Sequence, residues 1–227
     1  MMNFFRSIGD TLAYMGSLSV GMLDGVKYTV GLFFITILFS IPLGLFLTLL
    51  RNSKIHVLKG ITGFYVWLMR GTPLLLQLFF FYFGLPNLPL IGDYLILGRF
   101  QAACLTFVLN YAAYFCEIFR GGILSVDAGQ YEAAQVLGFS KWQTNLKIVF
   151  PQMLKVCLPS ISNECITLVK DTALITAISV TEILYFAKAA VNRDTDATAY
   201  VVAAVFYLIM TYGLTRLFNW LERKFHY

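Results

Sequence analysis

Five long apolar segments constrain the fold of this 227-residue chain more than any other feature of its sequence. They cover residues 28–50, 64–84, 100–119, 156–179 and 198–218. A helix needs about 20 apolar residues to cross the roughly 30 Å hydrocarbon core of a bilayer. Hydrophobic residues make up 59% of the chain and charged residues only 13%, a composition typical of membrane proteins. We therefore predict an all-α integral membrane protein with five transmembrane helices, in one transmembrane domain of residues 26–220.

The N-terminal segment differs from these five. Residues 4–23 contain Arg6, Asp10 and several glycines and serines, so we expect residues 1–25 to form an interfacial segment rather than a sixth span. A basic leader followed by an uninterrupted apolar core is missing there, so a cleavable signal peptide is not expected. Residues 221–227 are expected to form a short tail.

Basic residues predict the orientation, because loops on the cytoplasmic side are enriched in Lys and Arg. One side of the predicted membrane domain carries ten of them: Arg51, Lys54, Lys59, Arg120, Lys141, Lys147, Lys155, Arg216, Arg223 and Lys224. The other side carries five, with several acids: Arg6, Lys27, Arg99, Lys188 and Arg193, with Asp10, Asp24, Asp93, Glu182, Asp194 and Asp196. The N-terminus should therefore face outward and the C-terminus the cytoplasm. A basic cytoplasmic face explains the net charge of +5 without a nucleic-acid partner.

A polar insertion separates the third and fourth spans, at residues 127–151. Its sequence around Glu132 predicts a short helix in which Ala133 and Ala134 offer a small-residue face to a groove. Gly138 can adopt the left-handed conformation that ends a helix. Ser140 and Gln143 have the spacing of a capping box, which predicts a second helix. We expect this polar segment to bind something outside the bilayer.

The second span is interrupted by Arg70, Thr72 and Pro73. Proline removes a backbone donor and clashes with the carbonyl four residues back, so the helix should kink or restart here, with Thr72 as a cap. Broken helices in membranes are tolerated where they line a cavity. Gln77, on the next turn, is a further candidate for the pathway. Arg70 has two open interpretations, extension to the nearby interface or a gating or pairing role.

The fourth span carries the strongest polarity inside the bilayer. At 100° per residue, five of its polar residues share one helical stripe, flanked by Lys170 and followed by Thr172. The stripe consists of Ser160, Asn163, Glu164, Thr167 and Asp171. Such a stripe should avoid lipid, because charges in the bilayer centre cost at least about 2.5–3.5 kcal/mol each. Three roles remain open: a polar network that locks a dimer, with Thr167 bridging to Asp171; contact with substrate; or gating. As substrate contacts, Glu164 would suit an ammonium or guanidinium group and Lys170 a carboxylate.

Other chemistry-bearing residues suggest no site. Glu117 and Arg120 should form an ion pair at a helix end and position a turn at Gly121–Gly122. The four cysteines lie in or beside spans without CxxC spacing, which favours a packing role over metal or disulfide chemistry. His56 and His226 lie at membrane edges. The sequence contains no GxxxxGK[ST] phosphate loop.

Four stretches of the chain resemble binding-protein-dependent ABC importer permeases of the type I fold. In the insertion, Gln130, Glu132, Ala133, Ala134, Gly138 and Pro151 resemble the EAA signature of that family. The segments RGTPLLLQLFFFYFGLP, AAYFCEIFRGGILSV and LPSISNECITLVKDTALITAISVTEI are similar to permeases for polar amino acids, the histidine, glutamate, glutamine and arginine group. The similarities cover residues 31–182 in order.

This resemblance implies a non-catalytic permease subunit in a bacterial cytoplasmic (inner) membrane. Its implied partners are an ABC ATPase dimer that holds ATP and Mg, a second permease copy or paralogue, an extracytoplasmic amino-acid-binding protein, and a polar amino acid as substrate. The chain itself would bind no cofactor. Two alternatives stay open at this point: a secondary transporter that couples to ions through the charges of the fourth span, and a structural subunit of a membrane complex.

Overall fold

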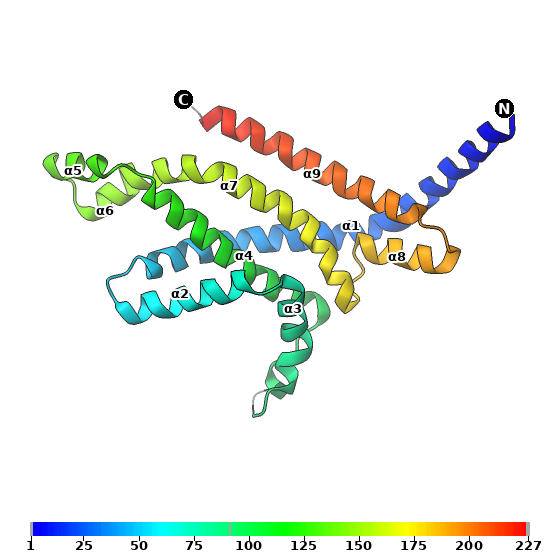
Figure 1. Cartoon of the computed structure of the whole chain (residues 1–227), viewed down its shortest axis with the longest axis horizontal. Coiled ribbons are helices and arrows are strands. Elements are labelled where there is room, and N and C mark those ends of the chain that lie inside the picture. The colour runs from blue at the N-terminus through cyan, green and yellow to red at the C-terminus, as the bar shows by residue number, and fades with distance from the viewer. Residues whose placement is uncertain (1, 91, 226–227) are drawn as a thin grey trace. The chain divides into compact units, whose positions relative to one another are not determined.

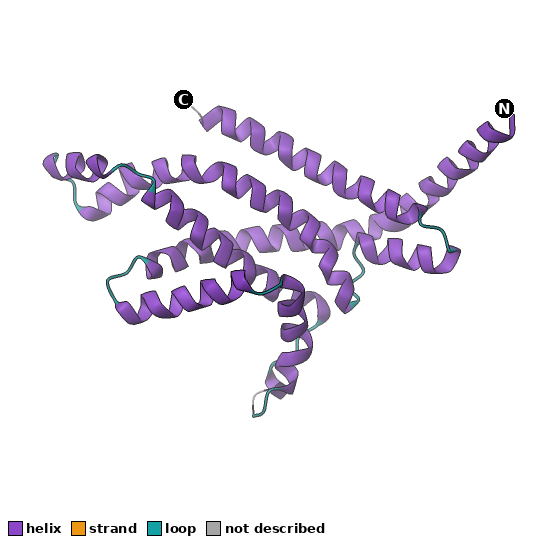
Figure 2. Ribbon diagram, viewed as in Figure 1, coloured by secondary structure: helices purple, strands orange, loops and turns teal. Residues whose placement is uncertain are grey.

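The computed structural model describes the backbone of residues 2–90 and 92–225, and the side chains of residues 9–90 and 92–225. Within this part of the chain all regular structure is helical (Figure 2). The α-helices, labelled in Figure 1, are α1 (Met2–Arg51), α2 (His56–Gly71), α3 (Leu74–Phe79), α4 (Arg99–Leu124), α5 (Ala128–Val136), α6 (Lys141–Thr144), α7 (Phe150–Asp171), α8 (Ile183–Asp194) and α9 (Thr198–Phe225). Two π-helical turns (Phe80–Gly84 and Asn145–Val149) and three 3₁₀ helices (Leu85–Asn87, Gly92–Tyr94 and η5, Thr172–Ile178) complete the set.

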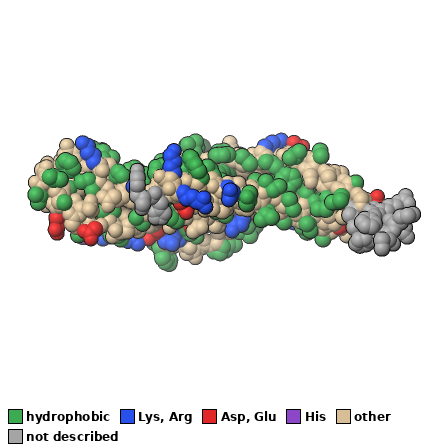
Figure 3. All heavy atoms as spheres, turned by 90° about the horizontal axis from the view of Figure 1, so that it is seen from above, with side chains coloured by type: hydrophobic (Ala, Val, Ile, Leu, Met, Phe, Trp, Pro, Cys, Tyr) green, Lys and Arg blue, Asp and Glu red, His purple; other side chains and the backbone are tan. Residues whose placement is uncertain are grey.

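Among the described residues, three helices are long and apolar enough to cross a membrane: Gly9–Arg51 within α1, α4 and α9. Two further pairs qualify if each bent pair is counted as one span, namely α2 with Leu74–Asn87, and Lys141–Ile178 with α8. Each of the five predicted segments falls in one of these, so the part of the chain that the structure describes contains three to five candidate spans. Apolar side chains cover much of the face seen in Figure 3, as expected for helices that contact lipid.

Helix α1 extends beyond the first apolar segment toward the N-terminus. The backbone is helical without interruption from Met2 to Arg51, so residues 4–23 belong to the same helix as the first apolar segment, and their interfacial placement stays a prediction. A 50-residue helix is about 75 Å long, which exceeds the roughly 30 Å of the hydrocarbon core. The side chains of residues 1–8 lie outside the described residues.

The chain divides into two compact units, and α1, α4, α7 and α9 each contribute to both. The first unit consists of Met1–Ile35, Leu75–Thr106 and Ile166–Gly213. Its core joins α1, α8 and α9 through small and aliphatic side chains. These are Leu18, Met22, Ile183, Ala187, Ala190, Ala199, Val202 and Ala203. The small residues of α8 and α9 let these helices approach closely without a large apolar side chain between them.

The second unit consists of Thr36–Leu74, Phe107–Cys165 and Leu214–Tyr227. Here Val66 of α2 packs on Ala113 and Cys116 of α4. Helix α1 approaches α4 so closely at Gly44 that a β-carbon there would lie 2.7 Å from that of Phe115. One turn on, the Thr48 hydroxyl lies 2.8 Å from the Gly44 carbonyl and 3.1 Å from that of Cys116.

Helix α8 was not predicted from the sequence. Its residues follow the fourth apolar segment and contain Lys188, Arg193 and Asp194, which the sequence placed only on the outer side of the membrane domain. The following α9 begins beside Asp196, whose carboxylate accepts hydrogen bonds from the Thr198 N–H at 2.8 Å and from its hydroxyl at 2.7 Å. The backbone N–H in particular lowers the pKa of Asp196.

The cysteines are mostly buried. Cys116, Cys157 and Cys165 are buried, Cys104 is partly buried, and all four are free thiols. No group of three or more His, Cys, Asp or Glu side chains is arranged to hold a metal within the described residues. His226 lies outside them.

Candidate functional site

The short helix predicted around Glu132 is present as α5 (Ala128–Val136). Asp127 begins it, with a side-chain oxygen that accepts the Gly129 N–H at 2.7 Å. Gly138 ends the turn after it in the left-handed region, at φ 77°, as predicted. The Gly138 N–H bonds to the carbonyl of Gln135, and the Phe139 N–H to that of Ala134, so the last carbonyls of α5 are satisfied.

The capping box is also confirmed. The Ser140 hydroxyl accepts the Gln143 N–H at 3.3 Å, and the Gln143 side chain accepts the Ser140 N–H at 2.9 Å. Helix α6 follows and continues through a π-helical turn directly into α7. Two short helices therefore stand at the N-terminal end of α7, joined by a tight turn at Gly138.

The exposed face of α5 and α6 differs from the prediction. Glu132 and Ala133 are exposed, but Ala134 is only 1% exposed and packs inward, so the alanine pair does not form one outer face. Apolar surface comes instead from Val136, Leu137 and Trp142, which are 88%, 71% and 71% exposed. The sequence signal for these three residues is their apolar character within a polar segment. Large exposed apolar side chains outside apolar spans mark an interaction surface.

A direct side-chain contact joins α5 to the start of α7. The Gln152 amide donates to the side-chain oxygen of Gln130 at 3.2 Å. Gln152 follows Pro151, which lies exposed in the first turn of α7. Because α6 and the π-helical turn Asn145–Val149 continue directly into α7, Pro151 lies within a continuous helical segment, where it removes one backbone donor.

The interruption of the second span is where the sequence placed it. Helix α2 ends at Gly71, Thr72 has an extended backbone, and α3 begins at Leu74 after Pro73. The Thr72 hydroxyl donates to the Leu68 carbonyl at 2.8 Å, so it satisfies a C-terminal carbonyl of α2. Gln77 is buried in α3, with a side chain 8% exposed.

Arg70 belongs to a cluster of charges that the sequence did not reveal. Glu117, 15% exposed, faces three guanidinium groups from three helices: Arg120 at 2.7 Å, Arg51 at 3.0 Å and Arg70 at 3.9 Å. Arg70 also lies over the Tyr114 ring, 5.3 Å from its centroid. The ion pair of Glu117 with Arg120 is therefore confirmed, and Arg70 has a pairing contact.

The expected turn at Gly121–Gly122 is wrong, because α4 continues to Leu124. Gly122 instead serves packing: a β-carbon there would lie 2.9 Å from Cγ of Met153 in α7 and closer still to Sγ of Cys157. Glu117 and Arg120 therefore lie in the same continuous helix, α4, as the close contact of Gly122 with α7.

The polar stripe of α7 is accessible in the isolated chain. Ser160, Asn163, Thr167 and Lys170 are exposed, and Glu164 and Asp171 are half-buried. Thr172 is buried, and its hydroxyl donates to the Val169 carbonyl at 2.6 Å. Since lipid is a poor environment for these groups, a second chain or a wet pathway has to cover them.

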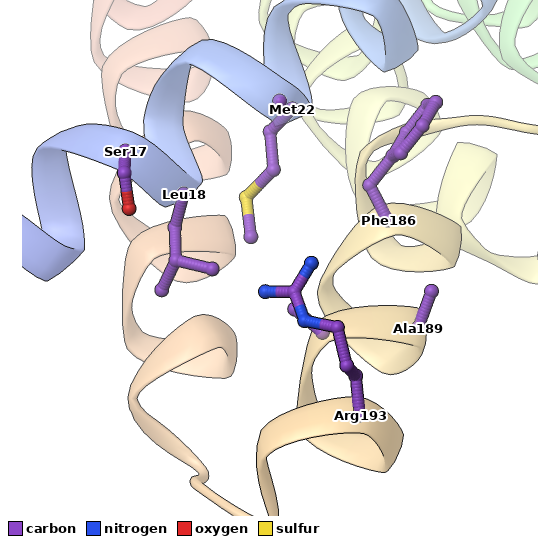
Figure 4. Close-up of a pocket in the computed structure, with 8 residues that line it drawn as sticks. Ser17, Leu18, Met22, Phe186, Ala189 and Arg193 are labelled. Atoms are coloured by element: carbon purple, nitrogen blue, oxygen red, sulfur yellow. The ribbon is translucent and has the colours of Figure 1, made fainter.

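A hollow in the first unit lies between α1 and α8 (Figure 4). Leu18 and Met22 line one wall, and Arg193 extends toward them from α8. The Arg193 guanidinium already binds Asp194 through two 2.6 Å contacts, and Asp194 also accepts the Tyr14 hydroxyl at 2.7 Å. Its charge is thus neutralised within the chain, which leaves the hollow without a net charge to attract an ion.

Comparison with known proteins decides the family. The family described as binding-protein-dependent transport system inner membrane component matches residues 40–227 of the sequence. The chain belongs to this family. It is therefore a transport permease subunit and a multi-pass component of the inner membrane.

Relatives of this family resemble the chain over nearly its whole length. It is 38% identical to the probable amino-acid ABC transporter permease protein YckA of Bacillus subtilis (strain 168), over 91% of this chain and 90% of the relative. It is 36% identical to the arginine ABC transporter permease protein ArtM of Haemophilus influenzae, over 89% and 91%. A solved amino acid ABC transporter with histidines matches with a TM-score of 0.85 and 30% identity, over 93% and 97%. The methionine ABC transporter MetNI, at 19% identity and a TM-score of 0.70, shares the fold.

Proposed function

We propose that this family member is the permease subunit of an ATP-driven importer of polar amino acids. The observation that carries the proposal is the α5–α6 element, a polar, capped helix pair with Glu132, Val136 and Trp142 exposed on it. Its setting in a chain similar to arginine and other amino-acid permeases supports the substrate class. The transmembrane domain would cover residues 26–220, with residues 127–151 as the coupling segment.

The orientation follows from charge. With the N-terminus outside and the C-terminus in the cytoplasm, α5 and α6 lie where a cytoplasmic ATPase dimer can bind them. ATP and Mg would be held by that partner, which alone would hydrolyse the nucleotide. Closure of the ATPase would move α5, and the motion would pass through Gln130, Gln152 and the first turn of α7 to the polar stripe.

The pathway would be lined by the stripe of α7 and by the broken second span. Asn163, Thr167 and Lys170 are exposed in the chain, so a second permease copy or paralogue can enclose them with its own stripe. Glu164 would bind the ammonium or guanidinium group of the substrate and Lys170 its carboxylate. An extracytoplasmic binding protein would deliver the amino acid.

Reconstitution with the ATPase tests the proposal. The permease is co-expressed with a candidate ATPase, and ATP hydrolysis is measured with a binding protein loaded with arginine, glutamine or histidine in turn. Wild type should be stimulated, and Glu132→Lys should lose the stimulation because it reverses a charge on the docking surface. Asp24→Lys, an equally drastic change at an exposed position of α1, should retain it.

Other outcomes favour the alternatives. Uptake that survives ATP depletion and stops with a protonophore would establish ion coupling in place of ATP. A complex that binds the ATPase but moves no amino acid would indicate a structural subunit. Full activity of Glu132→Lys would contradict the assignment of α5 as the coupling helix.

A further inference from the structure

Glu182 is an acid that the sequence placed on the outer side of the membrane domain and that the structure buries completely, with 0% of its surface exposed. It stands at the break between the segment Lys141–Ile178 and α8, which are bent by 53°. A buried carboxyl group is costly unless hydrogen bonds replace its water. Its position at a bend suggests that these bonds hold the bend.

Three uncharged donors surround the carboxyl group. Oε1 accepts the N–H of Tyr185, in the first turn of α8, at 2.8 Å. It also accepts the hydroxyl of Thr176 in η5. Oε2 accepts the hydroxyl of Tyr207 in α9 at 2.6 Å. One side chain therefore joins the helix before the bend, the helix after it and a third helix.

The backbone of Glu182 is also held from behind. A β-carbon on Gly25 of α1 would lie 2.6 Å from the Glu182 carbonyl carbon and from the Ile183 nitrogen. Only glycine leaves room for this approach. Helix α1 thus packs against the backbone at the start of α8, next to the residue whose carboxyl group accepts these hydrogen bonds.

Local structure alone would not fix this bend. The 3₁₀ geometry of η5 has poorer hydrogen bonds than an α-helix. It ends at Ser179, a non-glycine residue with φ 59° in the left-handed region. The orientation of η5 therefore depends on tertiary contacts.

We propose that Glu182 is a positioning residue that fixes the Lys170–Asp171 end of α7 against α8 and α9, and thereby sets the affinity of the pathway for its amino acid. Lys170 and Asp171 directly precede η5, so a change in the orientation of η5 moves them. This inference rests on the proposed function, in which these residues line the pathway. Glu182 itself touches no substrate.

The test compares Glu182→Gln, Tyr207→Phe and the double variant in the reconstituted permease–ATPase complex. Tyr207→Phe removes one donor and keeps the other two, which guards against failure to fold. Matched controls are Glu222→Gln and Tyr212→Phe, both on α9, the latter at a 64% exposed position. The probe is the binding protein loaded with whichever of arginine, glutamine and histidine stimulates wild type most strongly.

Each single variant should raise the concentration needed for half-maximal stimulation about fivefold, the change that loss of one net hydrogen bond produces. The maximal rate should change less. In the double variant, the change in the half-maximal concentration should be much smaller than the two single effects combined, because both changes break the same bond. Amide exchange should accelerate in η5 and in the first turn of α8, and should stay unchanged in α5.

Two results would overturn the inference. One is an unchanged half-saturating concentration in both single variants. The other is a lower melting temperature with unchanged substrate dependence, which would indicate a purely structural role. If no amino acid stimulates wild type, the proposed function fails instead, while the exchange of η5 and α8 still decides whether Glu182 holds the bend.

Discussion

The side-chain amide of Gln152 in α7 donates to the side-chain oxygen of Gln130 in α5, at 3.2 Å. This bond joins α5, the proposed coupling helix, to the first turn of the helix that carries the polar stripe. Both residues belong to the second unit, so the connection is internal to one compact part of the chain. A movement of α5 therefore has a direct route into α7, in addition to the covalent route through α6.

Removal of this bond should weaken coupling without preventing ATPase binding. Because a net hydrogen bond contributes about 0.5–1.5 kcal/mol, Gln152→Ala should lower amino-acid-stimulated ATP hydrolysis by a factor of about 2–10. The measurement is a double-mutant cycle with Gln130→Ala. If the two effects add independently, the bond carries no coupling.

The Glu117 cluster should stabilise the second unit. Glu117→Gln leaves three guanidinium groups facing one another and should cost about 1–3 kcal/mol in the free energy of unfolding, since bonds to charged groups are the stronger ones. Arg120→Gln should cost more than Arg70→Gln, because Arg70 is more exposed and 3.9 Å away. Thermal unfolding in detergent measures the order, with the exposed Arg216→Gln as control. Equal losses of stability in Arg120→Gln and Arg70→Gln would mean that distance and burial do not determine how much each arginine contributes to the cluster.

Neighbouring glycines of α4 should respond in opposite ways to alanine. Gly122→Ala places a methyl group against Met153 and Cys157 and should destabilise by about 1–3 kcal/mol through overpacking. Gly121→Ala meets no atom within 4 Å and should be neutral or stabilising by up to about 1 kcal/mol, as alanine favours the helix. Unfolding curves of the two variants provide the comparison. Equal destabilisation would exclude the close packing of α4 on α7 at Gly122.

The start of α9 should depend on pH through Asp196. The pKa of this carboxyl is lowered in the folded chain by the Thr198 N–H, so its stabilising effect is full above the ordinary value of about 3.9 and is lost as the pH falls through the lowered value. Amide exchange of the first turn of α9, relative to Asp196→Asn, measures this loss. The asparagine keeps an accepting oxygen at every pH. An exchange ratio that is constant down to low pH would show that Asp196 does not cap the helix.

Much of the local structure followed from the sequence. Residues close in the chain determine the capping box of Ser140 and Gln143, the left-handed Gly138 and the break at Pro73, so their spacing was sufficient. The apolar segments likewise predicted a helical membrane protein, because a bilayer requires every backbone donor and acceptor to be satisfied within a helix or barrel.

Only the tertiary structure decided which side chains meet across helices. Glu117 finds Arg51 and Arg70 from distant segments, Ala134 turns inward, and Glu182, expected on the outer side of the membrane domain, is buried between η5, α8 and α9. A charge in a sequence carries no mark of its partner, since contact between helices depends on their rotation and on small residues such as Gly25 that permit close approach. The sequence by itself predicted the apolar helical segments and several of their caps. Packing between the helices determined which partners the buried charges of Glu117 and Glu182 meet.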